Sequence, residues 1–100
     1  MTGAATDTGT AEYVRSLEII NKRGLHARAS ARFVQLASTF DADIQVEKDG
    51  LEVDGSSILD LMMLAASPGC HITVRTKGPD AEPAMDAIAA LIADRFGEEC

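Results

Sequence analysis

The sequence predicts a two-layer α+β domain, in which helices cover one face of a sheet built from four strands. Four segments alternate apolar and polar residues or are rich in β-branched ones, and three others repeat apolar residues three and four positions apart. The two kinds follow one another in the order β-α-β-β-α-β-α. Strands with one apolar and one polar face are typical of an antiparallel or mixed sheet that helices cover on one side. A chain of 100 residues, 46% of them hydrophobic, is long enough for one such domain.

The first strand is predicted over residues 13–20, where β-branched and apolar side chains dominate. Polar residues and a glycine at positions 21–24 then form a turn. Helical spacing begins directly afterwards, and the helix is expected to run from about His26 to Thr39. Its apolar stripe consists of Ala29, Phe33, Leu36, Ala37 and Phe40.

A hairpin is predicted next. Apolar and polar residues alternate over residues 42–47 and again over residues 51–54. Lys48-Asp49-Gly50 connects the two strands, and Asp-Gly is a strong turn pair. The sequence Gly55-Ser56-Ser57 then breaks the second strand.

A short helix is expected after Ser57, because Ser57 and Asp60 fit a helix-capping pattern. Ser56 is the alternative cap, since loop register is uncertain by a residue or two. One side of the helix is formed by Ile58, Leu61, Met62 and Ala65, and another by Leu59 and Met63. Two interpretations remain open: a well-buried helix, or an exposed apolar patch on which a partner docks. Ser67-Pro68-Gly69 ends the helix.

The last strand is predicted from His71 to Thr76, and a turn at residues 77–80 leads into the last helix. The buried stripe of that helix comprises Met85, Ile88, Ala89, Ile92 and Phe96, and the helix ends at Gly97. Residues 1–12 are expected to form a disordered tail, residues 13–97 the folded domain, and residues 98–100 a solvated C-terminal tail.

Composition excludes several classes of function. The net charge of −7 argues against binding to duplex nucleic acid, whose phosphates require a basic face. No apolar stretch is long enough to span a membrane, and the first residues do not resemble a secretory signal. Two cysteines, one of them the last residue, form no disulfide framework, and no spacing resembles a metal site. These features predict a cytoplasmic protein without a metal ion.

The most informative segment is Gly24-Leu25-His26-Ala27-Arg28, at the junction of the first turn and the first helix. A helix start concentrates unpaired backbone N–H groups and a partial positive charge, so it favours anions. An imidazole that is neutral near pH 7 is a nucleophile, and a neighbouring arginine is a bidentate phosphate ligand. His26 and Arg28 therefore predict a site where a histidine is transiently phosphorylated.

The chain contains neither a nucleotide-binding glycine loop nor a pair of metal-binding carboxylates near this segment. We therefore expect no cofactor, and a phosphate held weakly enough to be passed on. We expect such a protein to have no chemistry of its own without a partner.

The sequence resembles the HPr family of histidine-containing phosphocarriers of the bacterial phosphoenolpyruvate-dependent phosphotransferase system. The resemblance covers residues 13–96. It rests on the segment from Asn21 to Arg28, on the helix start Gly55-Ser56-Ser57-Ile58, on Met62-Met63-Leu64, and on the order of the elements. It implies the family fold, an open-faced β-sandwich with a four-stranded antiparallel sheet and three helices on one face.

The resemblance also implies partners and roles. His26 matches the histidine that accepts a phosphoryl group from enzyme I and passes it to an EIIA domain, and Arg28 matches the neighbouring arginine. Ser57 matches a serine that many family members offer to HPr kinase/phosphorylase. The docking surface of the family predicts partner contacts from Leu25, expected to be exposed, and from Ile58, Leu59 and Met62. The family usually has proline after the arginine, whereas this chain has Ala29, so a looser first helical turn is expected.

Three functions therefore compete. The first is a phosphocarrier that feeds an EIIA domain of the sugar or the regulatory branch. The second is a regulatory protein similar to the NPr proteins of the nitrogen branch, which acts mainly through phosphorylation-dependent binding. The third is an interaction domain without phosphorylation, against which the pair of His26 and Arg28 counts. A monomer is expected in each case.

Overall fold

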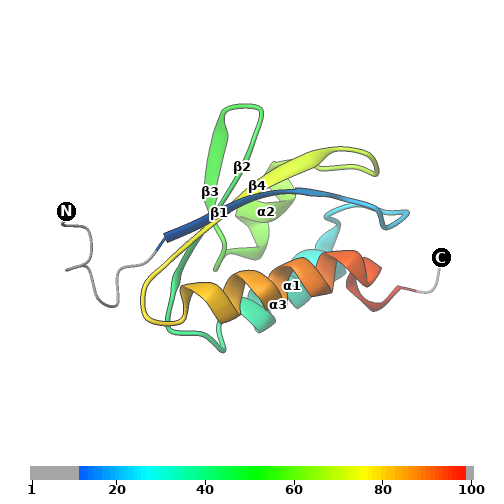
Figure 1. Ribbon diagram of the computed structural model, residues 1–100. Helices are drawn as coiled ribbons and strands as arrows, with labels where there is room; N and C mark the ends of the chain where they lie inside the picture. The colour runs from blue at the N-terminus through cyan, green and yellow to red at the C-terminus, as the bar shows by residue number, and fades with distance from the viewer. Residues whose placement is uncertain (1–11, 99–100) are drawn as a thin grey trace.

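A four-stranded antiparallel sheet with helices on one face forms the molecule (Figure 1). The computed structural model describes residues 12–98. The elements are β1 (Glu12–Glu18), α1 (Ala27–Ala37), β2 (Asp43–Lys48), β3 (Leu51–Asp54), α2 (Ile58–Met63), β4 (His71–Lys77), α3 (Ala81–Ala93) and a short 3-10 helix, η2 (Arg95–Gly97). This order and architecture confirm the predicted α+β fold. Residues 1–11 of the expected N-terminal tail lie outside the described residues, whereas Glu12 already belongs to β1.

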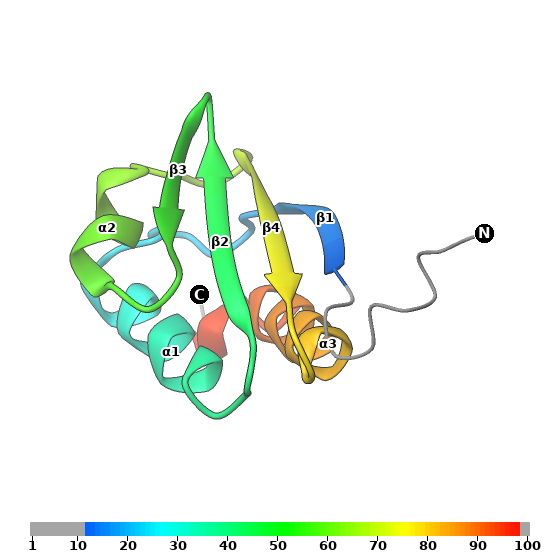
Figure 2. The same cartoon turned by 90° about the vertical axis from the view of Figure 1, so that its left-hand side faces the viewer.

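The strands lie in the order β1-β4-β2-β3, so the first and last strands of the chain are neighbours (Figure 2). β2 and β3 form the predicted hairpin, with Val46 opposite Val53. Its turn residues Asp49 and Gly50 both have positive φ, 53° and 87°, the conformation that hairpin turns of this kind require. The order β1-β4-β2-β3 places β1 and β3 at the two edges of the sheet.

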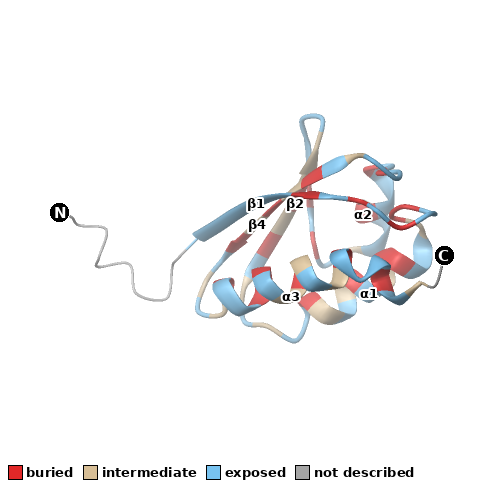
Figure 3. Cartoon of the chain, turned by 45° about the vertical axis from the view of Figure 1, so that its right-hand side comes forward, coloured by how far each residue is buried: buried red, intermediate tan, exposed pale blue. Residues whose placement is uncertain are grey.

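The hydrophobic core lies between the inner face of the sheet and the helices (Figure 3). Its largest fully buried apolar side chains are Phe33, Phe96, Ile19, Leu61, Ile72, Ile88, Val46 and Val74. Phe96 is buried as predicted, but it does not belong to the last helix. α3 ends at Ala93, and Phe96 lies in η2 with a left-handed backbone conformation, at a φ of 56°.

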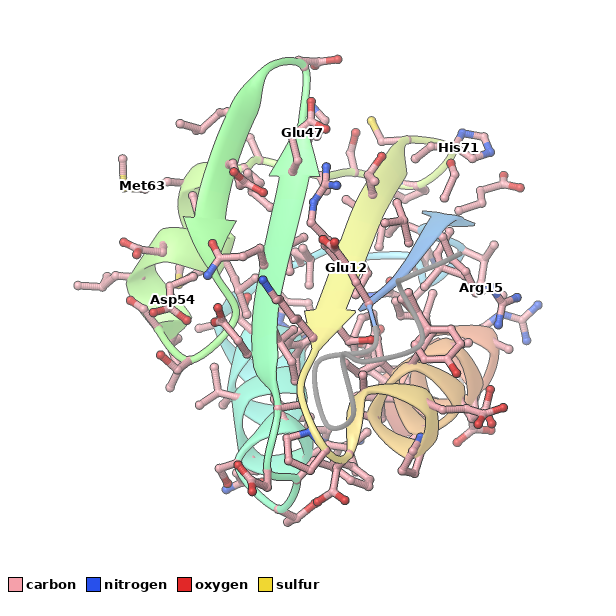
Figure 4. The ribbon with its side chains drawn as sticks, turned by 60° about the vertical axis from the view of Figure 1, so that its left-hand side comes forward. Glu12, Arg15, Glu47, Asp54, Met63 and His71 are labelled. Atoms are coloured by element: carbon pink, nitrogen blue, oxygen red, sulfur yellow. The ribbon has the colours of Figure 1, made fainter. Side chains whose placement is uncertain are left out.

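The outer face of the sheet is polar and faces solvent (Figure 4). Arg75 lies in the middle of this face, 3.6 Å from Glu52 and 3.9 Å from Glu12. Glu47 lies on the same face. The helices therefore cover only one side of the sheet, as the alternation of apolar and polar residues predicts.

None of the helices within residues 12–98 is both long and apolar enough to cross a membrane.

Candidate functional site

A tight turn after β1 positions the predicted site. The N–H of Gly24 donates to the carbonyl oxygen of Asn21 at 3.2 Å, and Gly24 has a φ of +65°. A Cβ atom at this position would collide with the carbonyl oxygen of Ala66. The next residue, Leu25, donates its N–H to that same oxygen at 2.9 Å. Only glycine combines this φ with so close an approach of two backbones.

His26 is the N-cap residue of α1. Its Nδ1 accepts the N–H of Arg28 at 3.2 Å, and the first intrahelical bond runs from the N–H of Ser30 to the His26 carbonyl oxygen at 2.9 Å. The imidazole therefore takes the place that Ser, Thr, Asp or Asn usually occupies at a helix start. The side chain is 24% exposed. Nδ1 thus lies at the positive end of α1.

The other ring nitrogen of His26 contacts a carboxylate. Nε2 lies 2.5 Å from Oε2 of Glu98, whose side chain is only 14% exposed. In a neutral imidazole one nitrogen donates and the other accepts. Because Nδ1 accepts from Arg28, we assign the proton to Nε2, which donates to Glu98. This hydrogen bond is the main cause of a pKa of Glu98 below its ordinary value.

Glu98 also contacts the turn before His26. Its Oε1 accepts from Nδ2 of Asn21 at 3.3 Å, and the same Nδ2 donates to the carbonyl oxygen of Gly24 at 2.8 Å. Asn21 is fully buried. The expectation that Glu98 belongs to a solvated tail is therefore wrong. The reason is that η2 turns the chain back toward the start of α1, a contact across 72 positions of sequence.

Arg28 lies in the first turn of α1 with an exposed side chain. Within the described part of the chain, its guanidinium forms no salt bridge with a carboxylate. The group is thus available to an anion bound at Nδ1 or at the free N–H groups of the helix start.

Leu25 does not have the predicted exposure. It is 4% exposed and belongs to the hydrophobic core. Its backbone is held on both sides, since its N–H donates to Ala66 and its carbonyl oxygen accepts from Oγ of the buried Ser30 at 3.2 Å. This segment is therefore anchored with the side chain inward, and a partner cannot pack on Leu25 as expected.

The short helix α2 begins as predicted. Ser57 is its N-cap residue, and its Oγ accepts the N–H of Asp60 at 3.2 Å. Ser56 instead donates its hydroxyl to Asp54 at 2.9 Å. The choice between Ser57 and Ser56 as the cap is thereby decided for Ser57.

α2 presents an apolar surface to solvent. Leu61 is its only buried residue, and the four exposed apolar residues, which we call the α2 patch, are Ile58, Leu59, Met62 and Met63. Leu59 is 72% exposed and Met63 is 66% exposed, and Met63 projects away from the domain in Figure 4. The interpretation of a well-buried helix is therefore wrong. Six residues form fewer than two turns, and this helix packs only one side against α1 and β3.

The site as a whole combines a partly exposed imidazole at a helix start with a carboxylate behind the ring. It also includes an exposed arginine, Arg28, whose guanidinium forms no salt bridge within residues 12–98. Among residues 12–98, no group of three potential ligands could hold a metal ion. Asn21 entered only as the first residue of the segment that carries the family resemblance, and neither it nor Glu98 was predicted to contact His26. An asparagine in a turn and a glutamate near the chain end are common and carry no spacing signal.

Comparison with known proteins gives consistent matches. A family model described as PTS HPr component phosphorylation site matches residues 13–94. Phosphocarrier protein HPr of Cupriavidus necator is 54% identical over 84 residues, which cover 84% of this chain and 94% of the relative. Phosphocarrier protein NPr of Shewanella violacea is 44% identical over 84 residues, covering 84% and 92%. A crystal structure of HPr-C-His from Thermoanaerobacter tengcongensis has a TM-score of 0.84 at 44% identity, covering 88% of this chain and 99% of that chain.

Proposed function

Because the chain belongs to the HPr family, we propose that it accepts a phosphoryl group from phosphorylated enzyme I on His26 and passes it to an EIIA domain. The observation that carries this proposal is the orientation of His26. Its Nδ1 faces the start of α1, where the N–H of Arg28 points at it from 3.2 Å. A nucleophile and the donors for the transferred phosphate thus lie side by side.

The chemical step needs no base from the protein. The lone pair of Nδ1 forms the new N–P bond, while the bond between phosphorus and the donor breaks and its electron pair stays with the donor. The proton on Nε2 remains in place. When the group is passed on, the N–P bond breaks and its electron pair returns to Nδ1, so the ring recovers its starting form.

Arg28 stabilises the transferred group in two ways. Once Nδ1 carries phosphorus, the Arg28 N–H loses its acceptor and can donate to a phosphate oxygen instead. Its guanidinium, which forms no salt bridge with any other residue of the described range 12–98, can bind the same oxygens. Fixed donors of this kind stabilise the charge that spreads over the oxygens during transfer. One guanidinium and a few N–H groups form a site of moderate strength, which suits a group that must leave again.

Incubation with phosphoenolpyruvate and enzyme I, followed by intact-mass measurement, tests the proposal. We expect a gain of one acid-labile phosphate, absent in His26→Ala and present in His71→Ala. The second variant is the matched control, because His71 is exposed at the start of β4. The absence of a mass gain with an active enzyme I would contradict the proposal.

We further propose that Ser57 is a regulatory phosphorylation site for an HPr kinase. Ser57 caps α2, directly before the α2 patch, and α2 packs against α1. A phosphate there would place about two negative charges beside the apolar surface on which enzyme I is proposed to dock. Ser57→Asp should therefore be phosphorylated more slowly by enzyme I than the wild type. Equal rates would exclude this mechanism.

The nitrogen branch is the second candidate, supported by the similarity to an NPr protein, which is 44% identical over 84 residues. Both candidates are phosphorylated on His26, but the second acts mainly through phosphorylation-dependent binding of partner proteins. Transfer to a sugar-branch EIIA and to a nitrogen-branch EIIA, measured in parallel, identifies the branch by which acceptor gains phosphate faster. The second candidate is favoured if a partner protein binds the phosphorylated and unphosphorylated forms with different affinity while neither EIIA gains phosphate efficiently.

A further inference from the structure

We propose that Glu98 is a positioning residue for His26. By accepting a hydrogen bond from Nε2, Glu98 keeps the imidazole proton on Nε2 and leaves Nδ1 as the nitrogen that is phosphorylated. This inference rests on the proposed phosphocarrier function. Glu98 lies beyond residues 13–94, the part of the chain that the family model matches. The contact therefore needs an explanation from this chain itself.

The geometry assigns a separate partner to each oxygen of Glu98. Oε2 lies 2.5 Å from Nε2 of His26, and Oε1 lies 3.3 Å from Nδ2 of Asn21. Asn21 is held in this orientation by its second hydrogen bond, to the carbonyl oxygen of Gly24 at 2.8 Å. If the amide were reversed, its oxygen would face two acceptors. Nδ2 therefore donates to both, and Glu98 must accept from it.

A carboxylate suits this position better than an amide. Glu98 receives donors from both sides, from Asn21 and from the protonated Nε2 of His26, so it needs two acceptor oxygens. A glutamine offers only one oxygen, and its NH₂ group would face one of the two donors. The charge matters as well, because hydrogen bonds to an ionised acceptor are stronger than those to a neutral one.

The turn that holds Glu98 is built at a cost in backbone strain. Arg95 and Phe96 both have a φ of 56°, which is unfavourable for residues other than glycine. Three contacts hold this conformation. Phe96 is buried in the core, and its carbonyl oxygen accepts a hydrogen bond from Nη1 of Arg32. The N–H of Glu98 donates to the carbonyl oxygen of Arg95 at 3.0 Å. The position of Glu98 is thus fixed by packing, which distinguishes it from a glutamate on a free tail.

The consequence for the reaction is a choice between two nitrogens. Phosphorylation at Nδ1 places the new phosphate at the start of α1, beside the N–H of Arg28. Phosphorylation at Nε2 would place it against Glu98 and away from the helix start. In the productive step the N–P bond forms at Nδ1, and the bond from phosphorus to the donor breaks. Nε2 keeps its proton and continues to donate it to Glu98 in a hydrogen bond. The ring gains a positive charge, which the carboxylate faces directly.

The test uses chemical phosphorylation, so that it does not depend on any partner protein. Phosphoramidate transfers its phosphoryl group to histidine and releases ammonia. The reaction is performed in a His71→Gln background, in which His26 is the only histidine of the sequence. Phosphorus–proton correlation by NMR then identifies which nitrogen of His26 carries the phosphate. Glu98→Ala and Glu98→Gln are compared with Glu82→Gln, which removes the same charge at the far end of α3.

In the background protein and in Glu82→Gln, Nδ1 should be the dominant product. In Glu98→Ala the ratio of Nδ1 to Nε2 product should fall at least about tenfold, as expected for the loss of a charge-assisted hydrogen bond. Glu98→Gln should lie between them. Circular dichroism verifies that each variant is folded.

An unchanged ratio in a folded Glu98→Ala variant would overturn the proposal. This outcome is independent of the proposed function, because the reagent replaces enzyme I. If enzyme I failed to phosphorylate the wild type while phosphoramidate still gave the predicted selectivity, the phosphocarrier function would be wrong and the role of Glu98 would stand. If enzyme I phosphorylated the wild type and Glu98→Ala at the same kcat and KM, with the same ratio of products, only the role of Glu98 would be wrong.

Discussion

Single residues with unusual surroundings determine the geometry of the site. Gly24 permits the turn, His26 caps α1 with its own imidazole, and Glu98 closes the site from behind. At each of these positions, a chemically similar residue could not take over the role. Gly24 is the simplest of them to test, because both its φ and its surroundings exclude a side chain.

Gly24→Ala should lower the free energy of unfolding by about 3 kcal/mol or more. A left-handed backbone costs alanine about 1–2 kcal/mol, and the added Cβ also collides with the carbonyl oxygen of Ala66. Gly50→Ala is the matched control, since Gly50 also has a positive φ but nothing lies within 4 Å of an added Cβ. Urea denaturation should give a clearly smaller loss for Gly50→Ala. Equal losses would mean that the contact with Ala66 adds nothing.

At the scale of the element, α2 is the informative case. It is only six residues long, buries Leu61, and exposes the four residues of the α2 patch. Isolated helices of this length are unstable in water, so its N-cap and its packing have to hold it together. Both the cap and the patch make testable predictions.

Ser57→Ala should lower the free energy of unfolding by about 1 kcal/mol, because the N–H of Asp60 loses its acceptor. The measurement is thermal or urea unfolding followed by circular dichroism. Ser56→Ala serves as the control and should cost less, since the Ser56 hydroxyl bonds an exposed side chain and not the helix. A larger loss for Ser56→Ala would reverse the assignment of the cap.

Leu59→Ala should weaken docking while leaving stability almost unchanged. Leu59 is 72% exposed, so little buried area is lost, and surface changes of this kind stay within about 0.5 kcal/mol. The expected result is a raised KM of enzyme I for the variant at an unchanged kcat. Val14→Ala is the control, because Val14 is 49% exposed on β1 and lies outside the α2 patch. An effect of equal size for Val14→Ala would argue against the α2 patch as a docking surface.

At the scale of the whole molecule, the two faces of the sheet have opposite character. The inner face packs on the helices, and the outer face is exposed and carries more carboxylates than cations. The charged residues that strand alternation places there are Glu12, Glu18, Asp43, Glu47, Glu52, Asp54, Arg75 and Lys77. Two copies that met through this face would bring like charges together.

We therefore predict a monomer in solution. Sedimentation equilibrium at low ionic strength should give a mass of 10.6 kDa. Addition of salt to about 1 M screens repulsion between the exposed carboxylates, so any weak association through the outer face should appear only there. A stable dimer at low salt would contradict the prediction.

Local patterns in the sequence were sufficient for most of the fold. Alternation identified the hairpin of β2 and β3, apolar spacing identified α1 and α3, and Ser57 with Asp60 marked the start of α2. His26 and Arg28 were identified as a pair because they lie two positions apart at the same helix start. All these features depend on residues a few positions apart, where backbone geometry alone decides what is close.

The tertiary structure decided what depends on contacts between distant segments. Leu25 is buried because the backbone of Ala66 and the hydroxyl of Ser30 hold its segment against the core, whereas its position beside His26 suggested exposure. Glu98 reaches His26 only because η2 reverses the chain after α3. No local pattern predicts the contact of Leu25 with Ala66 or that of Glu98 with His26, because each depends on the packing of elements far apart in sequence. The sequence by itself predicted a histidine and an arginine at a helix start, and the folded chain determined which groups surround the histidine.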